Sequence, residues 1–305
     1  MKKTTQKLLA YISEWINKPE GAYNIRENGM CVDTQNSKHV QIKPKKDGSG
    51  IDIHISAQAQ GEKIYIPACI TKSNVEDLVY NDFFIEDGAN ITIIAGCGIH
   101  TDGSGSSHHN GIHRFFVGKG AHVLYLEKHI GIGEGTGKRI INPKTLIELA
   151  KNSYMKIDTT QIEGVDSTHR ETQAKLAESS KLIIREKIMT HDAQTAFTDF
   201  EVALDGENSG ADLISRSVAK GSSKQLFRSR IYGNAACNGH SECDAIIMDS
   251  AEVSAIPELT ARNVDAALIH EAAIGKIAGE QIIKLMTLGL TEEQAEAKII
   301  EGFLK

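Results

Sequence analysis

Hydrophobic and polar residues alternate along most of the chain, from about residue 51 to residue 260. Isoleucines two positions apart mark several of these stretches: Ile51, Ile53 and Ile55; Ile64 and Ile66; Ile91 and Ile93. A period of two places alternate side chains on one face of an extended chain, so the pattern predicts β-strands with one buried face.

The strands form a degenerate repeat. Residues 83–93 (FFIEDGANITI) and 115–126 (FFVGKGAHVLYL) share an apolar pair, a short polar turn, Gly-Ala and a new alternating stretch. Similar turns of small residues follow at nearly even spacing, except for a longer gap before Gly221 that we expect to hold an extra short strand: Gly88, Gly120, Asn152, Ser179, Gly221 and Ser250. Tandem strands without long helices between them predict a β-solenoid, with a β-sandwich or jelly roll as the alternative.

The segment before the strands combines a helix with an irregular stretch. Apolar residues recur at helical spacing from about Thr5 to Asn17, and Pro19 and Gly21 are expected to end the helix. The residues on this apolar face are Leu8, Tyr11, Ile12, Trp15 and Ile16. Residues 20–50 look irregular, with a turn over 43–50.

After residue 261 we expect the strands to end and a helical hairpin to follow. Glu280 to Leu288 has helical spacing, and Gly289 is a typical helix stop. Thr291 and Gln294 have the spacing of a capping box. A second helix then carries Ala295, Ile299, Ile300 and Phe303. The chain therefore divides into an N-terminal segment (1–50), a β core (51–261) and a C-terminal helical domain (262–305).

Composition narrows the possible functions. The chain has 305 residues, 40% hydrophobic and 24% charged, and a net charge of −6, which argues against binding nucleic acid through phosphate contacts. No apolar run approaches the length of a membrane span, and the N-terminus lacks a signal core. Five cysteines, an odd and sparse number, favour a reducing compartment, so we expect a cytoplasmic protein.

Two segments carry candidate chemistry of low specificity. Residues 97–129 are rich in possible metal ligands, but their spacing matches no zinc motif, and hydrogen-bonded histidines are the favoured interpretation. The ligands in question are Cys97, His100, His108, His109, His113, His122 and His129. The segment GIGEGTGKR (131–139) imitates a phosphate loop, but it has Ile132 where a glycine is needed and Arg139 where a hydroxyl residue should follow the lysine.

The most concentrated group of ligand-type residues lies in residues 237–244. It contains two thiols, one imidazole and two carboxylates: Cys237, His240, Glu242, Cys243 and Asp244. Thiolates ligate iron–sulfur clusters and can carry sulfur as a persulfide. In a strand, the two cysteines would face the same side. The alternative is that Cys243 is a small core residue. The pair His270-Glu271, in an apolar setting, needs polar partners or forms a helix cap.

Four segments resemble the SufB/SufD family of the SUF iron–sulfur assembly system. CDAIIMDSAEVSAIPELTA (243–261), IHEAAIGKI (269–277) and LMTLGLTEEQAEAKIIEGFLK (285–305) are similar to its core and C-terminal end, and AGCGIH with HHNGIHRFFVGKGA (95–121) is similar as well. The resemblance implies a right-handed parallel β-helix with helical ends. It also implies a non-enzymatic scaffold that dimerises through the β-helix, works with a SUF-type ABC ATPase docked on the C-terminal helices, and passes its cluster to client apo-proteins.

By the same resemblance, Cys243 matches the cysteine of cluster assembly, and His270 and Glu271 match the neighbouring His-Glu pair. This sequence departs from the family in having Ile269 where a glutamate often precedes the histidine. The expected ligands of a transient cluster, of the 4Fe–4S type, are therefore Cys243, His270 and Glu271, with Cys237, His240, Glu242 and Asp244 as substitutes. The alternatives are an adaptor of the ATPase that binds no cluster and, last, a β-helix enzyme acting on polysaccharide.

Overall fold

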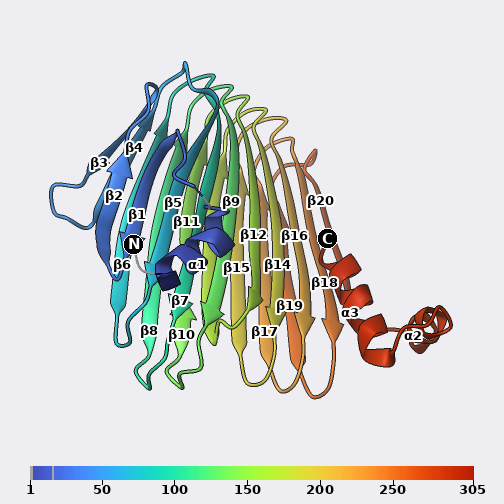
Figure 1. The fold of residues 1–305 in the computed structure, drawn as a ribbon. Helices are drawn as coiled ribbons and strands as arrows, with labels where there is room; N and C mark the ends of the chain where they lie inside the picture. The colour runs from blue at the N-terminus through green and yellow to red at the C-terminus, as the bar shows by residue number, and fades with distance from the viewer. Residues whose placement is uncertain (1–2, 16) are drawn as a thin grey trace.

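The computed structural model describes residues 3–15 and 17–305 and shows a β-solenoid in which two parallel sheets face each other (Figure 1). Sheet A contains, in spatial order, β2 (Met30–Gln35), β1 (Ala22–Glu27), β5 (Gln60–Ile70), β7 (Asn90–His100), β9 (His122–Ile132), β12 (Tyr154–Glu163), β14 (Lys181–Thr190), β16 (Gly210–Ala219), β18 (Asn238–Ile247) and β20 (Ala267–Gly275).

Sheet B contains β19 (Glu252–Ala261), β17 (Lys224–Gly233), β15 (Thr195–Leu204), β13 (Ser167–Leu176), β10 (Arg139–Ile141), β8 (Ser107–Val117), β6 (Glu76–Ile85), β4 (Gly50–Ile55) and β3 (Val40–Pro44), with β11 (Lys144–Leu149) pairing β8 and β13. From β4 onward the chain alternates between the two sheets, except that β10 and β11 both belong to sheet B. Neighbouring strands within each sheet are parallel, except for the antiparallel pairs β1–β2 and β3–β4. The predicted β-solenoid is confirmed, and the sandwich and jelly-roll alternatives are wrong.

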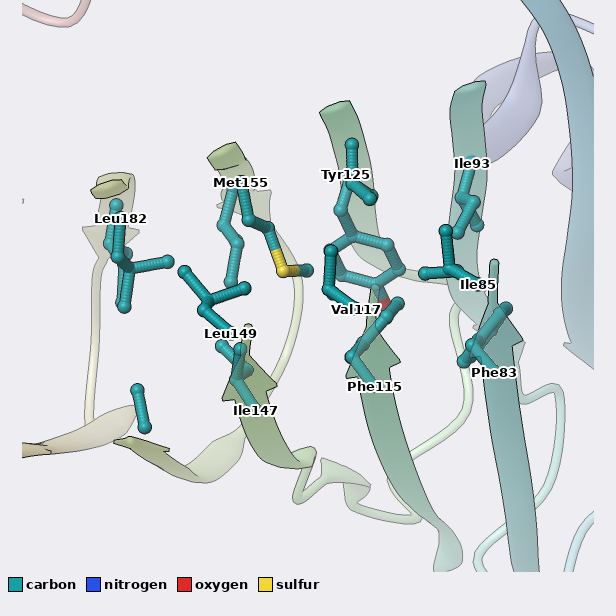
Figure 2. Close-up of a cluster of buried hydrophobic side chains, with 14 of the residues drawn as sticks. Phe83, Ile85, Ile93, Phe115, Val117, Tyr125, Ile147, Leu149, Met155 and Leu182 are labelled. Carbon is teal, nitrogen blue, oxygen red and sulfur yellow. The ribbon is translucent and has the colours of Figure 1, made fainter. Parts of the chain in front are cut away.

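The core lies between the two sheets and is built from the alternate residues that the sequence pattern marks. Figure 2 shows side chains of sheet B, such as Phe83 and Phe115, facing side chains of sheet A, such as Tyr125 and Met155. The rings of Phe83 and Phe115 stack with their centroids 4.4 Å apart. Each rung places like residues above like, so the core is continuous along the solenoid.

The turns between the sheets explain the uneven repeat. Residues with positive φ occupy the turns from sheet B to sheet A, and a second series occupies the opposite edge: Gly88, Gly120, Asn152, Ser179 and Asn208 on the first; Asp192, Gly221 and Asp249 on the second. The predicted series therefore crosses from one edge to the other after Ser179. The gap before Gly221 holds three full strands, β14 to β16, rather than one extra short strand.

The N-terminal helix is confirmed, although it ends earlier than predicted. Helix α1 (Lys3–Ser13) is followed by Glu14 at a φ of 54°. Its buried face includes Leu8 and Ile12, as expected, but the side chain of Tyr11 is half exposed. Ile16 lies outside the described residues. The helix packs on the outer side of sheet A, where a Cβ at Gly98 would lie 2.8 Å from Leu8.

The expectation of an irregular stretch over residues 20–50 is wrong, because β1, β2 and β3 lie within it. The predicted turn is confirmed, since the chain reverses between Pro44 and Gly50. At this end the strands form antiparallel pairs instead of the regular parallel rungs. Because strand β2 is largely exposed, its sequence shows little hydrophobic alternation.

The expectation that strands end at residue 261 is also wrong, because β20 adds a further strand to sheet A. The strand has no neighbour on one side and most of its residues are exposed, so it lacks the regular alternation of buried and exposed residues that marks the inner strands. The domain boundaries themselves stay a prediction. The helical hairpin follows as α2 (Gly279–Met286) and α3 (Glu292–Phe303), with the predicted capping box between Thr291 and Gln294. Within the described residues, no helix is both long and apolar enough to cross a membrane.

Candidate functional site

Strand β18 separates the predicted site residues onto two faces. Its burial alternates along its length, because odd-numbered residues point into the solenoid and even-numbered residues point to the outer surface of sheet A. The inward residues are Gly239, Ser241, Cys243 and Ala245, and the outward ones are His240, Glu242 and Asp244. The group that looked continuous in sequence is therefore two groups back to back.

Cys243 lies inside the solenoid, one strand from its C-terminal end. Its side chain belongs to the main hydrophobic core and is 1% exposed. Ser215 of β16 and Ala272 of β20 flank it in the ladder. Burial, with the nearby negative charges of Glu186 and Asp244, raises the pKa of the Cys243 thiol to about 12. The thiol is thus protonated at neutral pH in this conformation.

Cys237 is buried in the same core, as the shared parity of the two cysteines predicts. Burial raises the pKa of this thiol as well. All five cysteines are free thiols, and only Cys31 among them is exposed.

Strand β20 divides the His-Glu pair in the same way. In the ladder, His270 pairs with Ser241 and faces inward, whereas Glu271 pairs with Glu242 and faces outward. The Nδ1 atom of His270 is buried and has no hydrogen-bond partner among the described residues. The structure therefore places His270 on the same side as Cys243, but it does not bring Glu271 to that side.

The outward residues form a compact polar group. His240 Nδ1 lies 2.7 Å from Asp212 Oδ1, and His240 Nε2 lies 3.7 Å from Glu271 Oε2. Ligand atoms of His240, Glu242 and Glu271 all lie within 4.8 Å of one another. Burial, and then a hydrogen bond and repulsion from Asp244, raise the pKa of Glu242.

The C-terminal rung, formed by β19 and β20, is poorly covered. Both strands are sheet edges, and most of their residues are exposed. Large apolar side chains are among them: Ile256, Leu259, Ile269 and Ile274, each at least 37% exposed. Unpaired strand edges with apolar side chains are typical of surfaces that pair with another chain.

A buried charge network in the middle rungs escaped the sequence analysis. Arg170 Nη1 donates to Glu127 Oε2 at 2.6 Å, and its Nε lies 3.3 Å from Glu186 Oε1. Glu186 also accepts hydrogen bonds from Thr198 and Ser215. The available signal was the presence of charged residues at inward positions of alternating strands, as in THRETQAKL (168–176), where Arg170 has the parity of Leu176. A second unnoticed partner is Asp212, which orients His240.

The histidine-rich segment contains hydrogen-bonded histidines, in line with the favoured interpretation. His109 Nδ1 lies 3.0 Å from Asp77 Oδ2, and His113 Nδ1 lies 2.7 Å from the hydroxyl of Tyr125. His108 and His109 both lie in β8. The segment borders a cavity of about 420 Å³ near the N-terminal end of the solenoid, and Cys97 and His129 also line it.

Comparison with known proteins agrees with this architecture. Residues 72–303 match the family model described as the SufBD core domain of SUF-system FeS cluster assembly. Two relatives described as iron–sulfur cluster assembly SufBD family proteins are one from Archaeoglobus fulgidus, 33% identical over 80% of this chain and 66% of the relative, and one from Methanothermobacter thermautotrophicus, 30% identical over 90% of this chain and 67% of the relative.

A third relative of the same description, from Methanocaldococcus jannaschii, is 26% identical over the whole chain and 98% of its own length. The alignments with the first two span only about two thirds of those longer proteins. The match to the family model extends from β6 to the last helix, so it includes both Cys243 and the C-terminal rung. The chain belongs to the SufBD core domain family of the SUF iron–sulfur cluster assembly system.

Proposed function

We propose that this chain is a non-enzymatic scaffold on which an iron–sulfur cluster is assembled, with Cys243 as its principal thiolate. The observation that carries the proposal is the position of Cys243 and His270, which face the interior next to the C-terminal end of the solenoid, where most residues of β19 and β20 are exposed. A ligand held there is close to solvent and to any partner that covers the end. The cluster would be held only until it is transferred to another protein, and a site with few thiolates suits such temporary binding.

The buried thiol sets a condition on this function. A cysteine ligates iron as thiolate, so binding must remove the proton that the raised pKa of Cys243 retains. Iron, sulfide or a sulfur donor must also reach a side chain that is 1% exposed. We infer that assembly begins when the C-terminal rung is displaced from Cys243, since Ala272 of β20 is the last residue stacked over it.

We propose that a second copy of the chain completes the site. One cysteine and one histidine supply too few ligands for a 4Fe–4S cluster, which takes four. The exposed edges of β19 and β20, with their apolar side chains, support an isologous contact between two C-terminal ends. Such a contact would bring two copies of Cys243 and His270 to one interface.

We also propose that a SUF-type ABC ATPase docks on α2 and α3 and that client apo-proteins receive the cluster. The support is the exposed apolar surface of this hairpin, where Ile283, Met286 and Leu288 are 62%, 43% and 75% exposed. The chain lacks the residues of a phosphate loop, so ATP hydrolysis would have to come from the partner. Motion of the hairpin would then act on the adjacent C-terminal rung.

Anaerobic reconstitution with iron and sulfide, followed by Mössbauer spectroscopy, tests the scaffold proposal. Wild type should take up a cluster, and Cys243→Ser should lose most of it. Cys31→Ser is the matched control, because that thiol is exposed and far from the open end, and it should retain the cluster. Equal cluster content in Cys243→Ser and wild type would contradict the assignment.

The alternative is an adaptor that binds the ATPase and holds no cluster. One observation favours it: in this conformation Cys243 sits in the hydrophobic core with a protonated thiol. An adaptor would co-purify with the ATPase equally well, but its reconstitution would give no cysteine-dependent iron–sulfur absorption in either wild type or Cys243→Ser.

A further inference from the structure

We infer that the outer face of sheet A carries a mononuclear site for a divalent transition-metal ion, with His240, Glu242 and Glu271 as its ligands. Their ligand atoms lie within 4.8 Å of one another, in a group of three that stands alone among the described residues. The site lies on the side of β18 opposite to Cys243 and uses no thiol. It goes beyond the scaffold function and does not depend on it.

The ladder positions these three side chains. Glu242 and Glu271 are direct neighbours on the paired strands β18 and β20, and His240 lies two residues before Glu242 on the same face. His240 and Glu242 are two residues apart on β18, and Glu271 is opposite Glu242 on β20, so the three side chains lie together on the outer face of sheet A. The arrangement is a consequence of the parallel register rather than of loop geometry.

Asp212 on the neighbouring strand β16 fixes the imidazole. It pairs with His240 in the ladder, and its Oδ1 lies 2.7 Å from Nδ1. A proton held on Nδ1 by this carboxylate leaves Nε2 as the free lone pair, and Nε2 is the atom that faces Glu271 at 3.7 Å. Histidine ligands of metal ions characteristically donate their other N–H to a carboxylate in this way.

Carboxylates outnumber positive groups around the site. Like charges on directly neighbouring strand positions destabilise a sheet, yet Glu242 and Glu271 occupy such positions, with Asp244 next on the same face. The nearest fixed positive group is Arg216, whose Nη2 lies 3.7 Å from Glu242 Oε1 and which pairs with Asp244 in the ladder. A divalent ion between the glutamates would turn this repulsion into attraction.

The donor set indicates which ions fit. One imidazole and two carboxylates suit first-row divalent ions that accept nitrogen and oxygen, such as Fe²⁺, Mn²⁺, Co²⁺ and Zn²⁺, and lack the thiolates that soft ions prefer. The side chain of Glu271 is 68% exposed, so it is free to close on an ion that Glu242 and His240 hold first. Water would complete the coordination.

Anaerobic titration of the full chain with Co²⁺ tests the site, with binding followed by visible absorption and by equilibrium dialysis. We expect one ion per chain and the weak bands of nitrogen and oxygen ligation, without intense thiolate charge transfer. His240→Ala and Glu271→Gln should abolish this binding, and Asp212→Asn should weaken it roughly 10–100-fold. Cys243→Ser should leave it unchanged, which separates this site from the cluster.

The chain offers a matched control in His169, which lies on the outer face of sheet B with Glu171 at 3.7 Å but without a third ligand. His169→Ala should bind Co²⁺ like wild type. Circular dichroism verifies that each variant is folded. The site is disproved if wild type binds no ion, if His240→Ala and Glu271→Gln bind as tightly as wild type, or if the absorption shows thiolate ligation.

Discussion

The middle rungs and the C-terminal end of the solenoid place different chemistry in the same ladder position. Glu127, Glu186 and Cys243 all occupy one inward column, which runs through β9, β12, β14, β16 and β18. In the middle, rungs on both sides supply partners, and Arg170 bridges the two glutamates. At the end, Cys243 has a full rung on one side only and Ala272 on the other.

The comparison indicates that the position of an inward polar group along the solenoid decides whether charged neighbours surround it on both sides. Although burial raises the pKa of Glu127, attraction to His129 and Arg170 outweighs it and holds this pKa well below its usual range. The charge of such a group is compensated by its neighbours, and its side chain is held in place and inaccessible to solvent. Cys243 and His270 have the same inward orientation, but His270 lies on the edge strand β20 and only this strand separates Cys243 from the C-terminal end. We therefore propose that a partner acting at this end reaches these two inward groups first.

The largest effect should come from Arg170→Met. This change leaves Glu127 and Glu186 buried without their shared cation, and breaking a buried pair by removing one partner costs about 3–5 kcal/mol. Denaturant unfolding should show this loss as a lower midpoint. The result would confirm that the polar interior of the middle rungs serves stability.

The control is Arg228→Met, which removes an arginine from the outer face of sheet B. Arg228 is 32% exposed and lies 3.9 Å from Asp199, so its loss should cost no more than about 1 kcal/mol. Equal midpoints for the two variants would show that the buried network contributes no more than a surface pair, and the contrast between the regions would fail.

The sequence predicts the solenoid well because most of its strands bury one face. Wherever a rung has neighbours on both sides, burial demands the alternation that marks Ile51 to Ile55. The rule weakens at the ends: β20 has no strand beyond it, most of its residues are exposed, and its inward positions include the polar His270. The turns at Asp192 and Asn208 were missed, although both residues adopt positive φ as Asn152 and Ser179 do.

The candidate site was predictable in its residues but not in its geometry. Parity along one strand correctly places Cys237 and Cys243 on the same side. The position of Glu271 relative to Cys243 depends on how β20 pairs with β18, and the registry of a parallel ladder is not encoded within either strand alone. The same is true of Asp212, which meets His240 only through pairing of β16 with β18.

A second prediction concerns pH and the middle rungs. Burial lowers the pKa of His113 to about 4, below the value of 6.5 for an unperturbed histidine. The unfolded chain therefore binds a proton first, and stability present above about pH 6.5 is lost as the pH falls toward 4, by roughly 3 kcal/mol for this group. His113→Gln should flatten the fall in unfolding free energy between these values. Parallel curves for variant and wild type would exclude a buried neutral histidine.

A third prediction compares the reactivity of a buried thiol near the C-terminal end, Cys243, with that of an exposed thiol, Cys31. With a pKa near 12 and 1% exposure, Cys243 should react with a soluble thiol reagent at pH 7.5 roughly 10²-fold more slowly than the exposed Cys31. Peptide mapping by mass spectrometry measures both rates in one sample. Addition of the partner ATPase should accelerate Cys243 alone if the C-terminal rung is displaced. Similar rates in the isolated chain would mean that the terminal rung does not cover the thiol.

The smallest effect should distinguish the turns of the middle rungs from the free end. Gly120 and Gly275 both have space for a Cβ, with no atom within 4 Å, but Gly120 has a φ of +63°. Gly120→Ala forces an L-residue into the left-handed region and should lower the unfolding free energy by about 1–2 kcal/mol. Gly275→Ala, in a strand without that constraint, should be neutral or slightly stabilising. Thermal unfolding compares them, and an equal loss in both would show that φ at the turn does not limit the stability of the rung.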